Sequence, residues 1–342
     1  MLTYQNRILF RRWAAGDREA VEAEVRGQAG LGEKSLILET LDFLRSFERG
    51  ETAKPAAITY RHRIVLWTIL ECGSLAAARH YVSTVLGDSS VRIGSLPALV
   101  LAAPPTPPGQ DETEFADDPA ADVQVVPRAG SRTVLFVFTG GARRFCGPLV
   151  LMHQWFRRLD ANIVYLRDHS SMFYAGGIAS LGKGYDESVG RLWDIAWSLG
   201  AERVLCTGSS AGTFGALRYG LDLSAEKVLG LSGPSRLDDS AQRVLERLQR
   251  RRPSATPFDP GHLDMAALYG RTPRRPAVRM TFGQQNAIDR AEAENMQPIG
   301  GVELDPVPGV EEHDIVSALG SRGFEARLHW LVAPSSPRPS YH

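Results

Sequence analysis

The chain has few cysteines, no excess of either charge and no long apolar run. Its three cysteines, Cys72, Cys146 and Cys206, are widely spaced and odd in number, which argues against a disulfide framework. The 39 basic and 39 acidic residues balance, which argues against nucleic acid or an anionic membrane surface as the main partner. No apolar run approaches the roughly 18 residues that a membrane span requires, and no signal-type core opens the chain. We therefore expect a cytoplasmic protein without a membrane span.

The first hundred residues carry helical signals and almost no strand pattern. Asp17 can cap a helix over residues 19–25, and dense leucines predict further helices around 36–44 and 75–86. We interpret residues 1–100 as a helical accessory domain that can bind a protein partner or self-associate.

Two segments are predicted to be exposed connections. Residues 101–121 combine a proline cluster with a run of acidic residues, which favours an extended, solvated linker. Residues 333–342, rich in serine and proline, are expected to form a flexible tail.

Residues 122–332 alternate between strand and helix patterns, which predicts a mainly parallel sheet flanked by helices. Residues 234–276 interrupt this alternation as an insertion, with a helix expected over 239–250 and basic residues at 250–252. In such sheets the ligand site lies beyond the carboxyl ends of the strands. Strands are expected at 133–139, 162–166, 203–207, 227–232, 278–282 and from 302, and helices at 148–159, 185–199 and from 211.

The pentapeptide Gly208-Ser209-Ser210-Ala211-Gly212 lies between a predicted strand and a predicted helix. A G-x-S-x-G pattern in this setting is typical of a nucleophile elbow, in which flanking glycines give room to a strained central serine. Ser210 is therefore the candidate nucleophile. Ser209 is the nearest rival, but it lies off the centre of the glycine pair.

A serine nucleophile needs a base, and the base needs an orienting acid. Of the histidines after the elbow, only His313 lies in a loop directly after a late strand. Asp289 is the only carboxylate in the turn after the strand at 278–282, since the nearby Asn286 carries no charge. Asp289 can also cap a helix over 290–295, and Asp238 is the alternative acid.

Backbone donors for a tetrahedral oxyanion are expected on both sides of the nucleophile. The N–H of Ala211 is one candidate, and the N–H of Gly140 or of Gly141 is the other. Arg143, in the same glycine loop, can attract an anionic group of a substrate.

Residues 122–332 resemble the α/β-hydrolase superfamily in the order Ser210, Asp289, His313 behind a glycine loop. Phe138-Thr139-Gly140-Gly141 takes the place where many lipases and esterases carry a His-Gly-Gly motif. Residues 165–168 and 173–178 are similar to a bacterial branch that often accompanies surface-polysaccharide genes. In the superfamily, an insertion placed like 234–276 often caps the active site. Below it, we expect an acyl pocket lined by Trp155, Met172, Phe173, Tyr174 and Leu268.

The residues and the resemblance together predict a serine-dependent acyl hydrolase that cleaves an ester or thioester through an acyl-enzyme. Its substrate would be a small-molecule or glycan-linked acyl ester, and no metal or organic cofactor is implied. Two alternatives stay open. One is an acyltransferase to a glycan or small hydroxyl acceptor, and the other is a catalytically silent scaffold.

Overall fold

The computed structural model describes residues 9, 12–13, 16–27, 33–51, 59–71, 75–87, 94–105, 115–237, 246 and 260–334. The chain divides into two compact units. One comprises Met1–Pro119 with Gly147–Trp155, and the other comprises Ala120–Cys146 with Phe156–His342. Within the described ranges, no helix is both long and apolar enough to cross a membrane.

In the described residues of the first unit every regular element is helical. The helices predicted around 19–25 and 36–44 are present, and the one predicted over 75–86 continues as a π-helix from Tyr81. Asp17 does not cap the first of them, because its carboxylate accepts a hydrogen bond from Arg12 instead. The elements are α2 (Arg18–Arg26), α3 (Glu33–Glu48), α4 (Tyr60–Glu71), α5 (Leu75–His80), η1 (Tyr81–Leu86), α6 (Leu96–Ala102) and, up to Trp155, α7 (Leu149–Phe156).

The segment predicted as an exposed linker is packed at its described ends. Helix α6 extends into it as far as Ala102. Phe115 is buried, and its ring stacks on His153 with 4.3 Å between ring centroids. An aromatic ring removed from water in this way ties the end of the segment to the first unit. Residues 106–114 lie outside the described residues.

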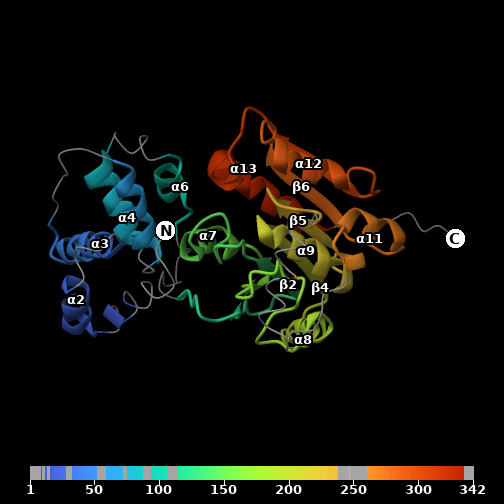
Figure 1. Cartoon of the computed structure of the whole chain (residues 1–342), viewed down its shortest axis with the longest axis horizontal. Helices are drawn as coiled ribbons and strands as arrows, with labels where there is room; N and C mark the ends of the chain where they lie inside the picture. The colour runs from blue at the N-terminus through green and yellow to red at the C-terminus, as the bar shows by residue number, and fades with distance from the viewer. Residues whose placement is uncertain are drawn as a thin grey trace. The chain divides into compact units, whose positions relative to one another are not determined.

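The second unit is built on a seven-stranded sheet in the order β1-β3-β2-β4-β5-β6-β7. Figure 1 labels its strands β2, β4, β5 and β6. All neighbouring strands are parallel except β1, which pairs antiparallel with β3 at the edge. The sequence pattern missed β1, because this strand is only four residues long. The strands are β1 (Val123–Val126), β2 (Thr133–Phe138), β3 (Asn162–Leu166), β4 (Arg203–Ser209), β5 (Lys227–Leu231), β6 (Ala277–Gly283) and β7 (Val302–Val307).

Apolar side chains cover both faces of this sheet. Phe136 and Phe138 of β2 belong to a core shared with the helices on one face. On the other face, Phe324 of α13 packs edge-on against Phe156, which packs against Tyr165 of β3. The expected α/β architecture, a mainly parallel sheet with flanking helices, is confirmed. The helices are α8 (Tyr185–Ser198), α9 (Ala211–Asp222), α11 (Met265–Arg271), α12 (Ala287–Met296) and α13 (Ile315–Val332).

The end of α13 is held at the amino ends of the central strands. The Lys227 ammonium, at the start of β5, donates to the carbonyls of Trp330 (2.8 Å) and Ala333 (2.7 Å). The Arg203 guanidinium, at the start of β4, donates to the carbonyl of Val332 at 3.3 Å. Cations at a helix C-terminus satisfy carbonyls that have no partner within the helix.

The described part of the insertion at 234–276 joins the core of the second unit. Leu268 of α11 is buried there, and the Tyr269 hydroxyl donates to the Leu217 carbonyl of α9 at 2.8 Å. Leu268 is therefore a core residue in this structure. The fallback acid Asp238 and the basic residues 250–252 lie outside the described residues. Of the helix predicted over 239–250, only Glu246 is described, and it is helical and exposed.

Candidate active site

The strand β4 runs into α9 through a strained turn centred on Ser210. Its φ and ψ are 53° and −128°, a conformation that costs a non-glycine residue about 1–3 kcal/mol. The turn closes because its flanking residues lack side chains. A Cβ atom on Gly208 would lie 2.0 Å from the Gly212 carbonyl oxygen, and one on Gly212 would lie 2.2 Å from the Phe138 carbonyl oxygen. The elbow geometry therefore requires both glycines.

Three side chains predicted from the sequence meet beside this turn. The Nε2 atom of His313 lies 2.9 Å from Oγ of Ser210. Its Nδ1 atom lies 3.0 Å from each carboxylate oxygen of Asp289. The Asp289 side chain is only 4% exposed, whereas that of His313 is 53% exposed. The buried carboxylate thus orients an imidazole that water can reach.

The neighbouring Ser209 is turned away from the histidine. It is buried, and its Oγ accepts a hydrogen bond from the Cys146 backbone N–H at 3.3 Å. Burial raises the pKa of the Cys146 thiol, which therefore stays protonated. Of the two serines in the elbow, only Ser210 has a base within hydrogen-bond distance.

Asn286 joins the two loops that carry the acid and the base. Its Oδ1 accepts from the Asp289 N–H at 3.1 Å, so the helix cap of α12 is Asn286 and not Asp289. Its Nδ2 donates to the Glu311 carbonyl at 3.0 Å, two residues before His313. The Gln285 N–H adds a bond to the Val310 carbonyl at 2.8 Å. The amide at 286 supplies both the acceptor and the donor of this link, whereas an ionised carboxylate there could only accept.

The pKa of His313 is raised, mainly by its hydrogen bond to Asp289 and further by the charges of Asp289 and Asp314. A base must be neutral to accept a proton, so we expect kcat/KM to fall on acidification with a midpoint above the ordinary value of about 6.5. The pKa of His313 is higher in the folded than in the unfolded protein. The pair of protonated His313 with Asp289 therefore stabilises the fold at low pH, and this stabilisation is lost as the pH rises through the folded-state pKa.

An NMR titration of the His313 ring measures this shift directly. In Asp289→Asn the midpoint should move to lower pH, because the largest cause of the shift is removed. Glu312→Gln removes a charge next to His313 that is not among those causes, and it should leave the midpoint in place. A midpoint at or below 6.5 in the unmodified protein would contradict the prediction.

The two glycines proposed as oxyanion donors differ in the structure. The N–H of Gly140 donates to the Arg144 carbonyl at 2.7 Å and is therefore occupied. Gly141 is exposed, and its N–H has no acceptor among the described residues; the same holds for the N–H of Ala211 at the start of α9. Arg143 lies in this turn with φ of 61°. The geometry favours Gly141 and Ala211 as the available pair.

The predicted acyl-pocket residues around 172–174 belong largely to the core. The Tyr174 ring is 1% exposed and packs edge-on against Phe138, 5.2 Å away. Met172 is equally buried, and Phe173 is half-buried against the same core. Trp155 is buried too, and it belongs to the first unit. The sequence pattern identified these residues as apolar but could not separate a pocket wall from a core.

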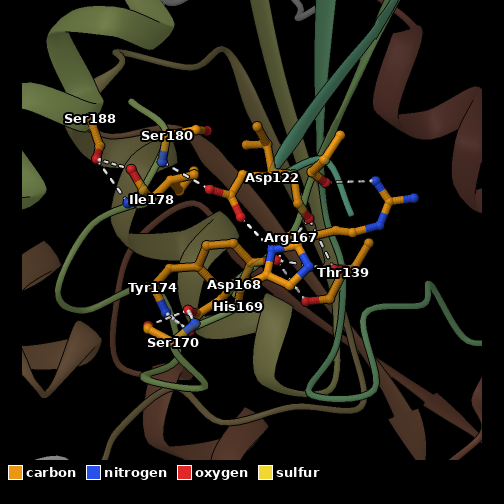
Figure 2. A network of polar contacts seen from close by, with 12 residues as sticks. Asp122, Thr139, Arg167, Asp168, His169, Ser170, Tyr174, Ile178, Ser180 and Ser188 are labelled. Atoms are coloured by element: carbon orange, nitrogen blue, oxygen red, sulfur yellow. Dashed lines mark hydrogen bonds and ion pairs between the residues drawn. The ribbon is translucent and has the colours of Figure 1, made fainter. Parts of the chain in front are cut away.

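Carboxylates anchor the loop after β3, from Arg167 to Gly184 (Figure 2). Asp168 accepts hydrogen bonds from the backbone N–H groups of Ser170 (2.8 Å), Met172 (2.7 Å) and Tyr174 (3.0 Å). Asp122 accepts from the Ser180 N–H at 2.8 Å and pairs with the His169 ring. These contacts fix the shape of the loop. No cluster of metal-ligating side chains occurs among the residues described.

No protein-family model matches the chain, and no curated protein matches its sequence. Among solved structures it is similar to a propionate-bound esterase of Thermogutta terrifontis, at 17% identity and a TM-score of 0.41, covering 63% of this chain and 91% of that one. It is similar to carboxyl esterase 2 of Tuber melanosporum at 14% identity and TM-score 0.41, covering 61% and 78%. A truncated carbohydrate esterase from gut microbiota gives 10% identity and TM-score 0.46, covering 65% and 93%. Similarities of this size do not bear on the activity of this chain.

Proposed function

We propose that the chain is a serine-dependent acyl hydrolase of the esterase or thioesterase type. The observation that carries this proposal is the continuous hydrogen-bonded series from Ser210 Oγ through the His313 ring to the buried Asp289 carboxylate. A hydroxyl is a weak nucleophile at neutral pH, and an oriented imidazole at 2.9 Å can take its proton during attack. The strain at Ser210 supports the same conclusion, because strained backbone clusters at active sites.

The reaction would proceed in two steps. Ser210 Oγ attacks the acyl carbonyl while His313 Nε2 takes the hydroxyl proton, and Asp289 stabilises the resulting imidazolium. The negative oxygen of the tetrahedral intermediate is met by the N–H groups of Ala211 and Gly141. His313 then protonates the leaving alcohol or thiol as the carbon–oxygen or carbon–sulfur bond breaks. Water, activated by the same imidazole, releases the acyl group and frees Ser210.

Exposure of the base favours hydrolysis over transfer to another acceptor. The His313 side chain is half-exposed, so water can reach the nitrogen that must deprotonate it. A transferase has to keep water from this position. The proposed substrates are small-molecule or glycan-linked acyl esters, and the chemistry uses no cofactor.

A fluorophosphonate probe tests the proposal. It should form a covalent adduct with the folded protein, and fragmentation of the labelled peptide should place the adduct on Ser210. Ser209→Ala is the matched control and should still be labelled, whereas Ser210→Ala should not. A folded protein that stays unlabelled, or an adduct on Ser209, would contradict the assignment.

A further inference from the structure

We propose that Tyr174 is a positioning residue for the oxyanion donor Gly141, acting through the carbonyl of Thr139. This inference rests on the proposed acyl hydrolysis at Ser210. Tyr174 lies far from the elbow in sequence, and its ring takes no part in the reaction. It acts by fixing one peptide plane beside the nucleophile.

The Tyr174 hydroxyl lies between the ends of two strands. Its oxygen is 2.9 Å from the Thr139 carbonyl oxygen and 2.8 Å from that of Leu166. The Leu166 oxygen already accepts from the Thr139 N–H at 3.0 Å and from the Thr139 hydroxyl at 2.9 Å. The Thr139 hydroxyl lies farther from the Tyr174 oxygen, at 3.2 Å. Since a carbonyl offers two lone pairs and those of Leu166 are taken, the single proton of Tyr174 is best assigned to the Thr139 carbonyl oxygen at 2.9 Å. Burial raises the pKa of Tyr174, so the hydroxyl remains a donor.

The peptide group between Thr139 and Gly140 is thereby held at both ends. Tyr174 binds its oxygen, and the Arg144 carbonyl accepts its N–H at 2.7 Å. This peptide group lies against the nucleophile, since a Cβ atom on Gly140 would come within 3.2 Å of Ser210 Cβ. The next N–H along the chain belongs to Gly141. Rotation of the fixed peptide group would therefore redirect the donor that faces the developing oxyanion.

Tyr174 is itself held in an unusual conformation. Its φ is 63°, which is uncommon for a bulky residue and persists only where the surroundings impose it. The Asp168 carboxylate supplies that constraint by accepting the Tyr174 N–H at 3.0 Å (Figure 2). The Phe138 ring packs against the tyrosine ring and limits its tilt. A series of contacts thus runs from Asp168 through Tyr174 and Thr139 to the glycine loop.

Tyr174→Phe tests the inference, because it removes the hydroxyl and keeps the ring. The variant loosens the Thr139–Gly140 peptide group but leaves the Gly141 N–H in place. We therefore expect kcat for an activated ester to fall about tenfold, which is less than the loss caused by removing a whole oxyanion donor. KM should stay nearly unchanged. The Ki of a trifluoromethyl ketone, which forms an oxyanion on Ser210, should rise by the same factor as kcat falls.

Tyr269→Phe is the matched control. Tyr269 is equally buried, and its hydroxyl also donates to a backbone carbonyl, that of Leu217 at 2.8 Å. It should change the melting temperature but not kcat. If Tyr174→Phe fails to fold, Asp168→Asn keeps the hydroxyl and removes the charge that holds the Tyr174 N–H, with the same loss of kcat and ketone affinity expected.

Two results overturn the inference, and they are distinguishable. An unmodified protein that turns over esters while Tyr174→Phe retains its kcat and ketone affinity overturns the role of Tyr174 alone. A folded, unmodified protein with neither ester turnover nor a Ser210 adduct overturns the proposed function and this inference together.

Discussion

His313→Ala should lower kcat/KM for ester hydrolysis by about 10⁵- to 10⁶-fold, an effect as large as that expected for loss of the nucleophile Ser210. The variant removes the proposed base of Ser210, because the His313 Nε2 atom lies 2.9 Å from Ser210 Oγ. The side chain is half-exposed, so its removal opens no buried cavity and folding should be little affected. Steady-state kinetics on an activated ester, with circular dichroism to verify folding, measure the loss.

His329→Ala is the control for this variant. His329 is exposed on α13, so its loss should leave kcat unchanged. A residual rate above that of water is expected in His313→Ala, since the oxyanion donors remain. A loss below tenfold in His313→Ala would mean that another group serves as the base.

Asp289→Asn should lower kcat by about 10⁴-fold while leaving the fold intact. The amide has the size of the carboxylate but cannot stabilise a positive imidazole. It can also donate to Nδ1, which would place the ring proton on Nε2 and turn it toward Ser210. The effect is large because Asp289 is buried and both of its oxygens lie 3.0 Å from Nδ1. Single-turnover acylation of Ser210 reports the loss directly.

Asp305→Asn provides the comparison. Asp305 is a partly buried carboxylate paired with Arg327 at 2.8 Å, and it is not among the causes of the raised His313 pKa. It should cost stability but preserve kcat. A second test moves the carboxylate from 289 to 286 by combining Asp289→Asn with Asn286→Asp. We expect this double variant to stay inactive, because side chain 286 is directed to the backbone N–H of residue 289 and to the Glu311 carbonyl. Recovery would show that a carboxylate at 286 reaches the imidazole.

The sequence was most informative where one local feature determines the geometry. The spacing of Gly208 and Gly212 around Ser210 predicts the elbow, because only glycines permit the close approach there. The chain order of Asp289 and His313 followed from the strand pattern, since parallel strands end at one edge of the sheet. Position within the motif also predicted which of the two serines is the candidate nucleophile, because Ser210 lies at the centre of the glycine pair and Ser209 does not.

The remaining features depend on contacts between distant segments. The local sequence does not predict that the N–H of Gly140 donates to the Arg144 carbonyl, whereas the N–H of Gly141 has no acceptor among the described residues. Nor can it tell that Tyr174 turns inward to reach Thr139, since aromatic residues suit a pocket wall and a core equally. The antiparallel β1 was missed because so short a strand gives a weak signal, and the ring of Phe115 is packed by the distant His153.

The contacts at the end of α13 also concern the order in which the chain is made. Lys227 and Arg203 receive their carbonyl partners from residues 103 to 129 positions later in the chain. During synthesis, β4 and β5 thus emerge long before these carbonyl groups, although Glu226, which pairs with Arg203, emerges with β5. Burial already lowers the pKa of Lys227, so its ammonium is poorly solvated in the closed sheet. A nascent chain ending before Trp330 would keep the Arg203–Glu226 ion pair at 2.7 Å but would leave the Lys227 ammonium without its two carbonyl acceptors, so we expect the sheet to gain stability when residues 330–333 have left the ribosome.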